Sequence, residues 1–530
     1  MSTLTGTRHL VRLILRRDRV LLPLWVLVLA VLPMTYATSF FELFPTAAER
    51  AAYATGTATN PSIVALLGPV YGDSVGALTA QRGGFLTLIV GLVSLLTVIR
   101  HTRTEEEAGR RELLGATVLG RYAGLTAALL VTYAANLLLG LLTAAGLAAT
   151  DLPVAGSLGY GLSTALVGVV FATVGGLAAQ LTEAAGGARG IGVGLLGLAF
   201  ALRLAGDTAE RDWPSWLSPL GWAPRIRAYE GERWWVLALP VALTVLLAAL
   251  AYPLSVRRDL GAGLLPPRLG PAHAGRGLSG PFGLAWRLHR GALLGWSVGF
   301  GLLGLILGGA AEAAGRSVEG NARLEEIMAR LGGTSALAEA YLGSTLGFVG
   351  LAAAGYGIAA ALRMRTEEAA GRAEPLLATG VHRSRWLASH LLFALVGPVV
   401  VLAVAGLATG LTYGISVGDV PGQLSRMLGA GLAQVPAAWV LAGLAVLLYG
   451  LLPRYAPVAW GVLVLCVLLG QLGAVLELSR WLLDVSPFTH TPQVLGDSWT
   501  ATPLIALTAL ALLLAGTGLA GFRRRDVPTT

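Results

Sequence analysis

The sequence predicts an all-α integral membrane protein of about 12 transmembrane helices, arranged as two parallel six-helix repeats with amphipathic elbow helices. Hydrophobic residues make up 55% of the 530 residues and charged residues only 13%, a far more apolar composition than that of a soluble protein. The apolar residues form runs of about twenty, the length that crosses a bilayer as a helix. One densely charged segment also occurs twice, once in each half of the chain.

The first half, residues 1–256, contains an elbow and six expected spans. Residues 4–19 mix leucine and valine with arginine, a composition typical of a helix lying among lipid headgroups. A long polar stretch follows the first span, and the charged segment follows the second. A Trp- and Pro-rich stretch after span five is typical of the membrane interface on the far side. The expected spans are 20–40, 84–99, 122–149, 158–181, 190–205 and 235–256.

The second half, residues 281–530, repeats this plan after a Pro- and Gly-rich linker at 257–280. Arg287, Arg290 and Trp296 repeat the spacing of Arg16, Arg19 and Trp25, so a second elbow is expected before span seven. The expected spans of this half are 292–311, 346–362, 387–415, 428–452, 458–478 and 503–522.

The charge and the rarer residue types exclude several function classes. All 38 basic residues are arginine, and the formal net charge is +9. These arginines flank apolar runs instead of clustering with aromatic residues on a soluble face, so no nucleic-acid partner is expected. A Walker A loop requires lysine, so this chain has no ordinary ATP-binding domain. Cys466 stands alone in an apolar run, and the histidines lack the spacing of metal ligands. We expect no catalytic residue, no metal site and no cofactor in this chain.

The doubled segment reads Thr-Glu-Glu-x-Ala-Gly-Arg-x-Glu in both halves. On a helix, Glu106 and Arg110 would form a salt pair four residues apart, as would Glu368 and Arg372, each worth only tenths of a kcal/mol. So small a gain does not explain a repeat in residue order, and the segment is interpreted as a docking surface. The alternative is an ordinary solvated loop. The candidate site residues are Glu105, Glu106, Gly109, Arg110 and Glu112, matched by Glu367, Glu368, Gly371, Arg372 and Glu374.

Three further expectations concern this docking surface. The acids are expected to be exposed, so that reversing their charge would abolish transport and leave folding intact. Gly109 and Gly371 are expected to allow close approach of a partner's backbone. The second copy has Ala369, Ala373 and Pro375 where the first has larger or charged residues, so unequal contributions of the two copies stay open.

The arginine distribution assigns both termini and both charged segments to the cytoplasm. Two parallel repeats of six spans are typical of transporters. Most of the expected spans contain no acid, whereas ion-driven transporters usually carry ionisable groups there. Arg203 and Glu477 lie near the ends of spans five and eleven, where snorkelling to the interface is the favoured interpretation and a substrate role the alternative. The driving energy is therefore expected to come from another protein.

The elbow, the charged segment after span two and its repeat after span eight resemble the fused twelve-span ABC-2-type permeases of actinobacteria, the polyketide antibiotic exporters of the tetronasin-resistance type. The resemblance covers the whole chain. It implies the permease subunit of an ATP-driven exporter in the bacterial plasma membrane, moving hydrophobic or amphiphilic compounds such as antibiotics. It also implies two copies of a separate soluble ABC ATPase, which would bind ATP and Mg and dock on the charged segments.

A proton-coupled drug antiporter of the major-facilitator type is the alternative, since that family also has twelve spans and a charged motif after spans two and eight. Only the run from Ala108 to Arg111 matches the tail of that motif, and neither charged segment contains Asp. A membrane enzyme or scaffold is a third class, for which no catalytic constellation is visible. A neighbouring reading frame encoding an ATPase would favour the first interpretation over both others.

Overall fold

The computed structural model describes ten stretches of the chain: residues 3–110, 118–208, 212–259, 261–265, 272–273, 275–278, 280–316, 334–472, 479–492 and 500–526. The chain divides into two compact units, Met1–Gly270 and Pro271–Thr530. The division falls within the stretch expected to be a linker, and each unit is described below by itself.

Every regular element in the described residues is helical. Unit 1 contains α1 (Thr7–Arg17), α2 (Leu21–Leu43), α3 (Ala47–Ala58), α4 (Pro61–Leu67), α5 (Val75–Arg82), η1 (Gly83–Phe85), α6 (Leu86–His101), α7 (Arg103–Glu107), α9 (Ala123–Ala148), α10 (Val154–Leu181), α11 (Ala185–Thr208), α12 (Trp213–Trp216), α13 (Pro219–Arg225), η2 (Trp234–Leu237) and α14 (Ala238–Arg257). Unit 2 contains η3 (Arg276–Leu278), α15 (Pro281–Arg316), α17 (Thr334–Ala369), α18 (Ala373–Ala378), α19 (Arg383–Val417), α20 (Val420–Leu432), α21 (Val435–Leu451), η4 (Pro453–Tyr455), α22 (Val458–Leu472), α23 (Arg480–Leu483), η5 (Pro487–His490) and α24 (Thr502–Arg524).

In the described residues, 11 helical segments are long and apolar enough to cross a membrane, and a shorter apolar helix covers Val458–Gly470. Each of these twelve segments overlaps one of the twelve expected spans, which confirms an all-α integral membrane protein. Expected span eleven continues to residue 478, and its last part, including Glu477, lies outside the described residues.

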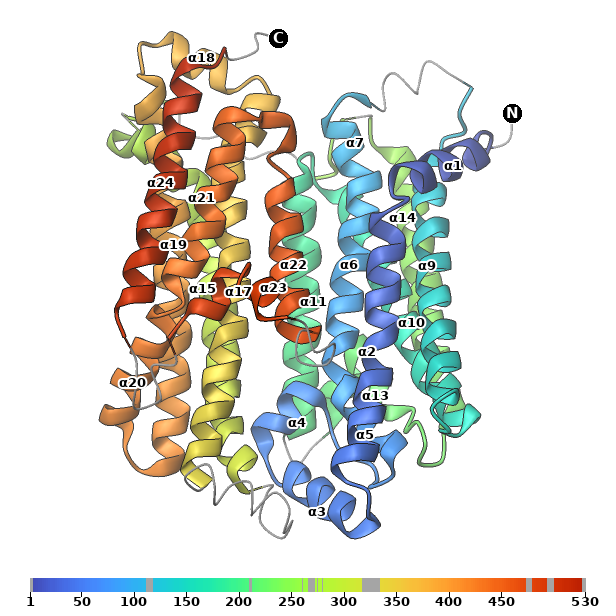
Figure 1. Cartoon of the computed structure of the whole chain (residues 1–530). Coiled ribbons are helices and arrows are strands. Elements are labelled where there is room, and N and C mark those ends of the chain that lie inside the picture. The colour runs from blue at the N-terminus through green and yellow to red at the C-terminus, as the bar shows by residue number, and fades with distance from the viewer. Residues whose placement is uncertain are drawn as a thin grey trace. The chain divides into compact units, whose positions relative to one another are not determined.

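The spans of each unit pack side by side (Figure 1). In unit 1, α10 packs against α9, α6 and α14, and 83% of its most apolar window is buried. Helices α1 and α7 lie at one end of this unit, and α3 and α5 lie at the other (Figure 1). In unit 2, α19 packs against α15, α17 and α20, while α21 packs against α24. Helix α18 lies at the end of unit 2 where the chain terminates, opposite α20 (Figure 1).

Small residues let the span backbones touch in both units. A Cβ added to Gly161 of α10 would lie 2.2 Å from the carbonyl oxygen of Gly140 in α9. A Cβ added to Gly450 of α21 would likewise lie 2.0 Å from the carbonyl oxygen of Gly518 in α24. Such close approach of two backbones stabilises the packing of helices by van der Waals contacts. In lipid these contacts matter because the hydrophobic effect does not drive helices together.

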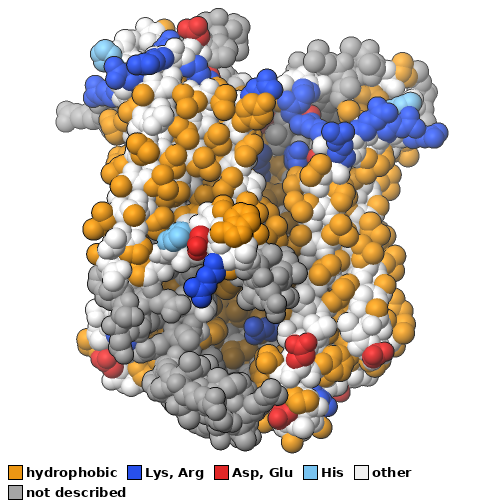
Figure 2. All heavy atoms as spheres, viewed as in Figure 1, with side chains coloured by type: hydrophobic (Ala, Val, Ile, Leu, Met, Phe, Trp, Pro, Cys, Tyr) orange, Lys and Arg blue, Asp and Glu red, His pale blue; other side chains and the backbone are white. Residues whose placement is uncertain are grey.

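The sides of each unit are covered by hydrophobic side chains, and arginines gather at the end of unit 1 that carries α1 and at the end of unit 2 that carries α18 (Figure 2). Large apolar side chains project outward from the spans, as shown by Val245, Leu294 and Leu513, which are 64%, 69% and 66% exposed. Such a surface suits a lipid environment and not water.

Two features differ from the sequence expectations. The polar stretch after span one contains helices α3 to α5, which begin at the capping residues Thr46, Asn60 and Ser74. The second elbow is continuous with span seven in α15, whereas the first elbow is a separate helix. In unit 1 the helix is interrupted at Asp18, a residue type that is disfavoured in helix interiors. The corresponding residue of unit 2 is His289, which lies within α15.

Candidate functional site

The first charged segment forms a short helix that ends in a glycine, called here the first turn (residues 102–110). Helix α6 stops at Thr102, whose φ and ψ are −117° and −84°, and α7 follows. After α7 the backbone turns at Gly109, which has a φ of +67°. The amide of Gly109 donates to the carbonyl oxygen of Glu106 at 2.9 Å. A Cβ on Gly109 would meet nothing within 4 Å, so the left-handed backbone is what requires glycine there.

This glycine shifts the expected salt pair by one residue. Arg110 donates through Nε and Nη2 to the two oxygens of Glu105, at 2.7 and 2.8 Å, so the expected pairing of Arg110 with Glu106 is wrong. The spacing of four applies to a continuous helix, and the chain leaves the helix before Arg110. Glu105 also accepts from Nη1 of Arg17 in α1, and therefore joins the elbow to the first turn.

Glu106 is buried and its side chain is only 2% exposed. Its Oε2 forms ion pairs with Nη1 of Arg103 at 2.7 Å and Nη1 of Arg258 at 2.8 Å. Nη2 of Arg258 donates to Oε1 of Glu106 at 2.9 Å. Arg258 directly follows α14, the last helix of unit 1. A single carboxylate therefore connects the turn to the end of the sixth span.

Arg103 fixes the base of the first turn to two other segments. Its side chain is fully buried, and its remaining hydrogens go to backbone carbonyl oxygens. Nε donates to Glu183 at 2.6 Å, Nη2 to Gly261 at 2.6 Å and Nη1 to Ala262 at 3.0 Å. These acceptors lie between α10 and α11 and shortly after α14, so the turn is tied to the ends of several spans.

The elbow is held to α6 by Asp18, which is 3% exposed. His101 Nε2 lies 2.6 Å from one of its oxygens, and Arg100 Nη2 lies 3.1 Å from the other. Burial by itself would raise the pKa of the Asp18 carboxyl, but the hydrogen bond from His101 and the neighbouring cations hold that pKa below its usual value.

The second turn (residues 366–372) ends in the same way, although α17 runs into it without the break that separates α6 from α7. Gly371, with φ +69°, donates its amide to the carbonyl oxygen of Glu368 at 3.0 Å. Arg372 donates through Nε and Nη2 to Glu367, at 2.7 and 3.2 Å, so the expected acceptor Glu368 is again replaced by the residue before it. Arg363 adds an ion pair to Glu367 at 3.0 Å.

Glu368 repeats the connection made by Glu106. It accepts from the Tyr449 hydroxyl of α21 and from Nη2 of Arg525 at 2.7 Å. Arg525 directly follows α24, as Arg258 follows α14. In each unit, the second glutamate of the turn therefore binds the arginine that follows the unit's last span. The charged segments alone gave no sign that Arg17, Arg258, Tyr449 or Arg525 are partners. The only sequence signal is an arginine placed directly after the last span of each repeat.

The expectation that the acids are exposed is wrong for the two consecutive glutamates of each turn. The side chains of Glu105, Glu106, Glu367 and Glu368 are 16%, 2%, 6% and 11% exposed, because each carboxylate points back toward arginines of its own unit. The exposed parts are the tips: Arg110 and Arg372 side chains are 47% and 51% exposed, and Glu374 is exposed. Glu112 lies outside the described residues.

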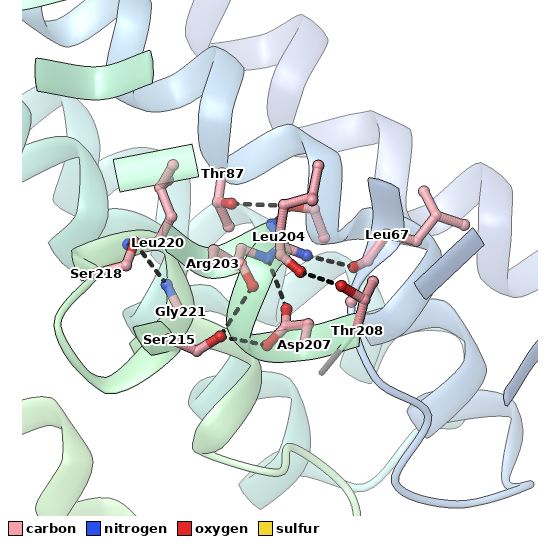
Figure 3. Close-up of polar contacts among 12 residues, drawn as sticks. Leu67, Thr87, Arg203, Leu204, Asp207, Thr208, Ser215, Ser218, Leu220 and Gly221 are labelled. Atoms are coloured by element: carbon pink, nitrogen blue, oxygen red, sulfur yellow. Dashed lines mark hydrogen bonds and ion pairs between the residues drawn. The ribbon is translucent and has the colours of Figure 1, made fainter. Parts of the chain in front are cut away.

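Arg203 at the other end of α11 does not snorkel, which corrects the favoured interpretation of this residue. Its side chain is fully buried and donates to the carbonyl oxygens of Leu67 at 2.7 Å and Gly84 at 3.0 Å (Figure 3). Its Nε pairs with Asp207 at 3.2 Å (Figure 3). Arg225 pairs with the same carboxylate at 3.2 Å. This cluster ties α11 to α4, η1 and α13, which is a structural role.

Replacing Ser215 by alanine tests this cluster. Its hydroxyl lies 2.7 Å from Asp207 Oδ1 and 2.9 Å from the carbonyl oxygen of Arg203 (Figure 3). Losing a buried hydrogen bond to a charged group is expected to lower the free energy of unfolding by about 1.5–3 kcal/mol. Thermal unfolding of the purified protein measures this, with Ser39→Ala, an exposed serine of α2, as the control. Equal unfolding temperatures for both variants would contradict the described contact.

Comparison with known proteins identifies the family. The family model described as the C-terminal domain of the multidrug efflux system permease Rv1217c matches residues 278–523. The chain is 46% identical over 527 residues to the multidrug efflux system permease protein Rv1217c of Mycobacterium tuberculosis, covering 99% of this chain and 96% of that protein. An identity of this size over the full length establishes common descent. The chain therefore belongs to the family of the multidrug efflux system permease Rv1217c.

Proposed function

We propose that this chain is the membrane-spanning permease of an ATP-driven exporter of the ABC-2 type. It moves hydrophobic or amphiphilic compounds, including drugs, out of a bacterial cell, and ATP is hydrolysed by two copies of a separate soluble ABC ATPase. ATP and Mg bind to that ATPase. The two turns face the cytoplasm, as do both termini, and each turn receives one ATPase copy. Export of drugs is supported by the name of the relative, a multidrug efflux system permease.

The observation that carries this proposal is the shared construction of the two turns. Each presents an exposed arginine next to a glycine with positive φ, on a base of ion pairs that is buried in the first turn and partly buried in the second. A solvated connection needs no such base, because exposed ion pairs contribute little to stability. A lever that receives force from another protein does need one, since the force must reach the spans without deforming the turn.

The proposal is tested by copurifying the chain with an ATPase encoded by a neighbouring reading frame. The chain alone is expected to show no ATP hydrolysis, and native mass spectrometry is expected to show one permease with two ATPases. Export of a fluorescent hydrophobic dye from proteoliposomes should then require ATP. Dye export driven by a proton gradient without ATPase would overturn the proposal, and an active complex of one ATPase with one permease would overturn the role of the second turn.

The orientation gives a separate prediction. Cysteines introduced at Val118, which is 59% exposed, and at the exposed Ala378, each in a Cys466→Ser background, should react with a membrane-impermeant maleimide only after the cells are opened. The reason is that both positions closely follow the turns assigned to the arginine-rich, cytoplasmic side. Labelling of either cysteine in intact cells would contradict this topology.

A further inference from the structure

A cavity of about 440 Å³ lies in unit 1 between the elbow and the first turn. In the described part of the chain it is lined by α1, by the end of α6 with α7, by residues 119–125, and by the ends of α10 and α14. Its volume falls within the range that encloses a drug-sized molecule. The cavity is separate from the exposed tip of the first turn, because its lining includes Glu105 and Glu106 but neither Gly109 nor Arg110.

One side of the cavity is apolar. Leu10, Leu13 and Ile14 line it from α1, and Leu125 and Val256 line it from α9 and α14. The three residues of α1 are spaced three and four apart and form the apolar stripe of the amphipathic elbow. A helix of this kind lies at the boundary between lipid headgroups and hydrocarbon. A hydrocarbon chain at that depth would find an apolar wall already formed.

The other side of the cavity is charged. Glu105 and Glu106 line it, and each is bound by two arginines as described above. Arg121 and Asp259 add one exposed charge of each sign. The lining itself carries three charges of each sign. Arg103 and Arg110, which pair with its glutamates from outside the lining, bring the total to five positive and three negative charges. The acids are already satisfied by their arginines, so the field in the cavity favours an anionic group.

We propose that this cavity binds an acidic amphiphile, with its carboxylate or phosphate beside Arg121 and Arg17 and its hydrocarbon chain along α1 and α9. A membrane phospholipid and an exported compound both provide this chemistry. Because Glu105 and Glu106 form both a wall of the cavity and the base of the first turn, occupancy acts directly on that turn. Occupancy is expected to stimulate ATP hydrolysis by the complex, and this part of the inference rests on the proposed function. Binding of the amphiphile does not rest on it.

The test uses the full-length chain in an uncharged detergent. Oleate and dioleoyl phosphatidate are titrated, with neutral monoolein and cationic oleylamine as comparisons, and binding is measured by native mass spectrometry and calorimetry. Both acidic probes should bind about tenfold more tightly than monoolein, because a positive site adds a charge-assisted contact. Equal affinity for monoolein, or tighter binding of oleylamine, would overturn the proposal.

Two variants locate the binding. Arg121→Gln should weaken oleate binding about fivefold, whereas Arg16→Gln, an exposed arginine of α1 outside the cavity lining, should not. Val256→Trp should block binding by filling the cavity, whereas Val245→Trp, a lipid-facing position of the same helix, should not. Unchanged binding in both cavity variants would overturn the assignment, and Arg121→Gln keeps this test valid if Val256→Trp fails to fold, since Arg121 is exposed.

The ligand could be a membrane phospholipid or an exported compound, and the two are distinguished by what the cavity binds when the protein lies in a bilayer. If the ligand is a lipid, phosphatidylglycerol should copurify from nanodiscs, and excess oleate should not displace it. If the ligand is an exported compound, oleate should displace the lipid and stimulate ATP hydrolysis by the complex. Binding without stimulation supports the lipid and leaves the cavity assigned. A complex that exports other compounds while its permease binds neither acidic probe would overturn the cavity proposal and leave the proposed function standing.

Discussion

Replacing Glu106 by glutamine is expected to lower the free energy of unfolding of unit 1 by about 3–5 kcal/mol. The substitution leaves Arg103, fully buried, and Arg258, 5% exposed, without their shared counter-charge. A buried cation that loses its partner retains its desolvation cost. Thermal unfolding of the protein in detergent, monitored by size-exclusion chromatography, measures the change. A reduced yield of the variant from the membrane is also expected.

Two matched variants show whether this loss comes from the buried pairs. Glu374→Gln, an exposed acid of the second charged segment, should change the free energy of unfolding by less than about 0.5 kcal/mol. Combining Glu106→Gln with Arg258→Gln should cost less than the sum of the two single changes, because the residues share one interaction. A wild-type unfolding temperature for Glu106→Gln would show that the described ion pairs do not hold the turn.

This prediction replaces the one that the sequence alone suggested. The charged segments were expected to be exposed, so charge reversal at Glu105 and Glu106 was expected to leave folding intact. The structure shows that reversal would place each new arginine among arginines, at a buried position for Glu106 and a partly buried one for Glu105. Loss of transport in such a variant would therefore report misfolding as well as lost docking, and the tips of the turns are the better targets.

The sequence was sufficient to predict the membrane spans because hydropathy is a local property of the chain. Most runs of apolar residues between arginine-rich or Pro-rich segments became a helix close to the expected bounds, as α9 and α24 show. Helices α15 and α17 extend well beyond theirs, and span ten is divided between α20 and α21. Length and composition decide this, since a backbone in lipid must satisfy its hydrogen bonds internally. The short helices α3 to α5 were missed because their capping residues lie in a stretch without a strong apolar period.

The site was only partly predictable because its contacts join distant parts of the chain. The doubled segment identified the glutamates and the glycines, but Arg258 and Arg525 act across more than 150 residues. The pairing error had a local cause, since a glycine with positive φ interrupts the helical spacing before each arginine. Buried Arg203 was misread because proximity to a span end suggested snorkelling, whereas its guanidinium donates to carbonyl oxygens at the end of α4 and in η1.

Replacing Arg110 and Arg372 together by alanine is expected to abolish coupling while the fold is retained. Both side chains are about half exposed, at 47% and 51%, so losing their pairs with Glu105 and Glu367 should cost at most about 1 kcal/mol each. In the proposed complex the same guanidinium groups meet the ATPase. Removing a hydrogen-bonded charge from such an interface costs about 2–5 kcal/mol, which lowers the affinity at each turn at least tenfold.

The measurement is ATP hydrolysis by the reconstituted complex, together with dye export and native mass spectrometry. Hydrolysis should fall to the rate of the ATPase alone, and the mass spectrum should lose the species with two ATPases. Arg12→Ala with Arg16→Ala, two exposed arginines of α1 that lie outside both turns, should keep the wild-type rate. Because the variant removes charges only at the tips, its unfolding temperature should stay close to that of the wild type, which separates lost docking from lost folding. Export at the wild-type rate by the Arg110 and Arg372 double variant would show that the turns do not carry the force.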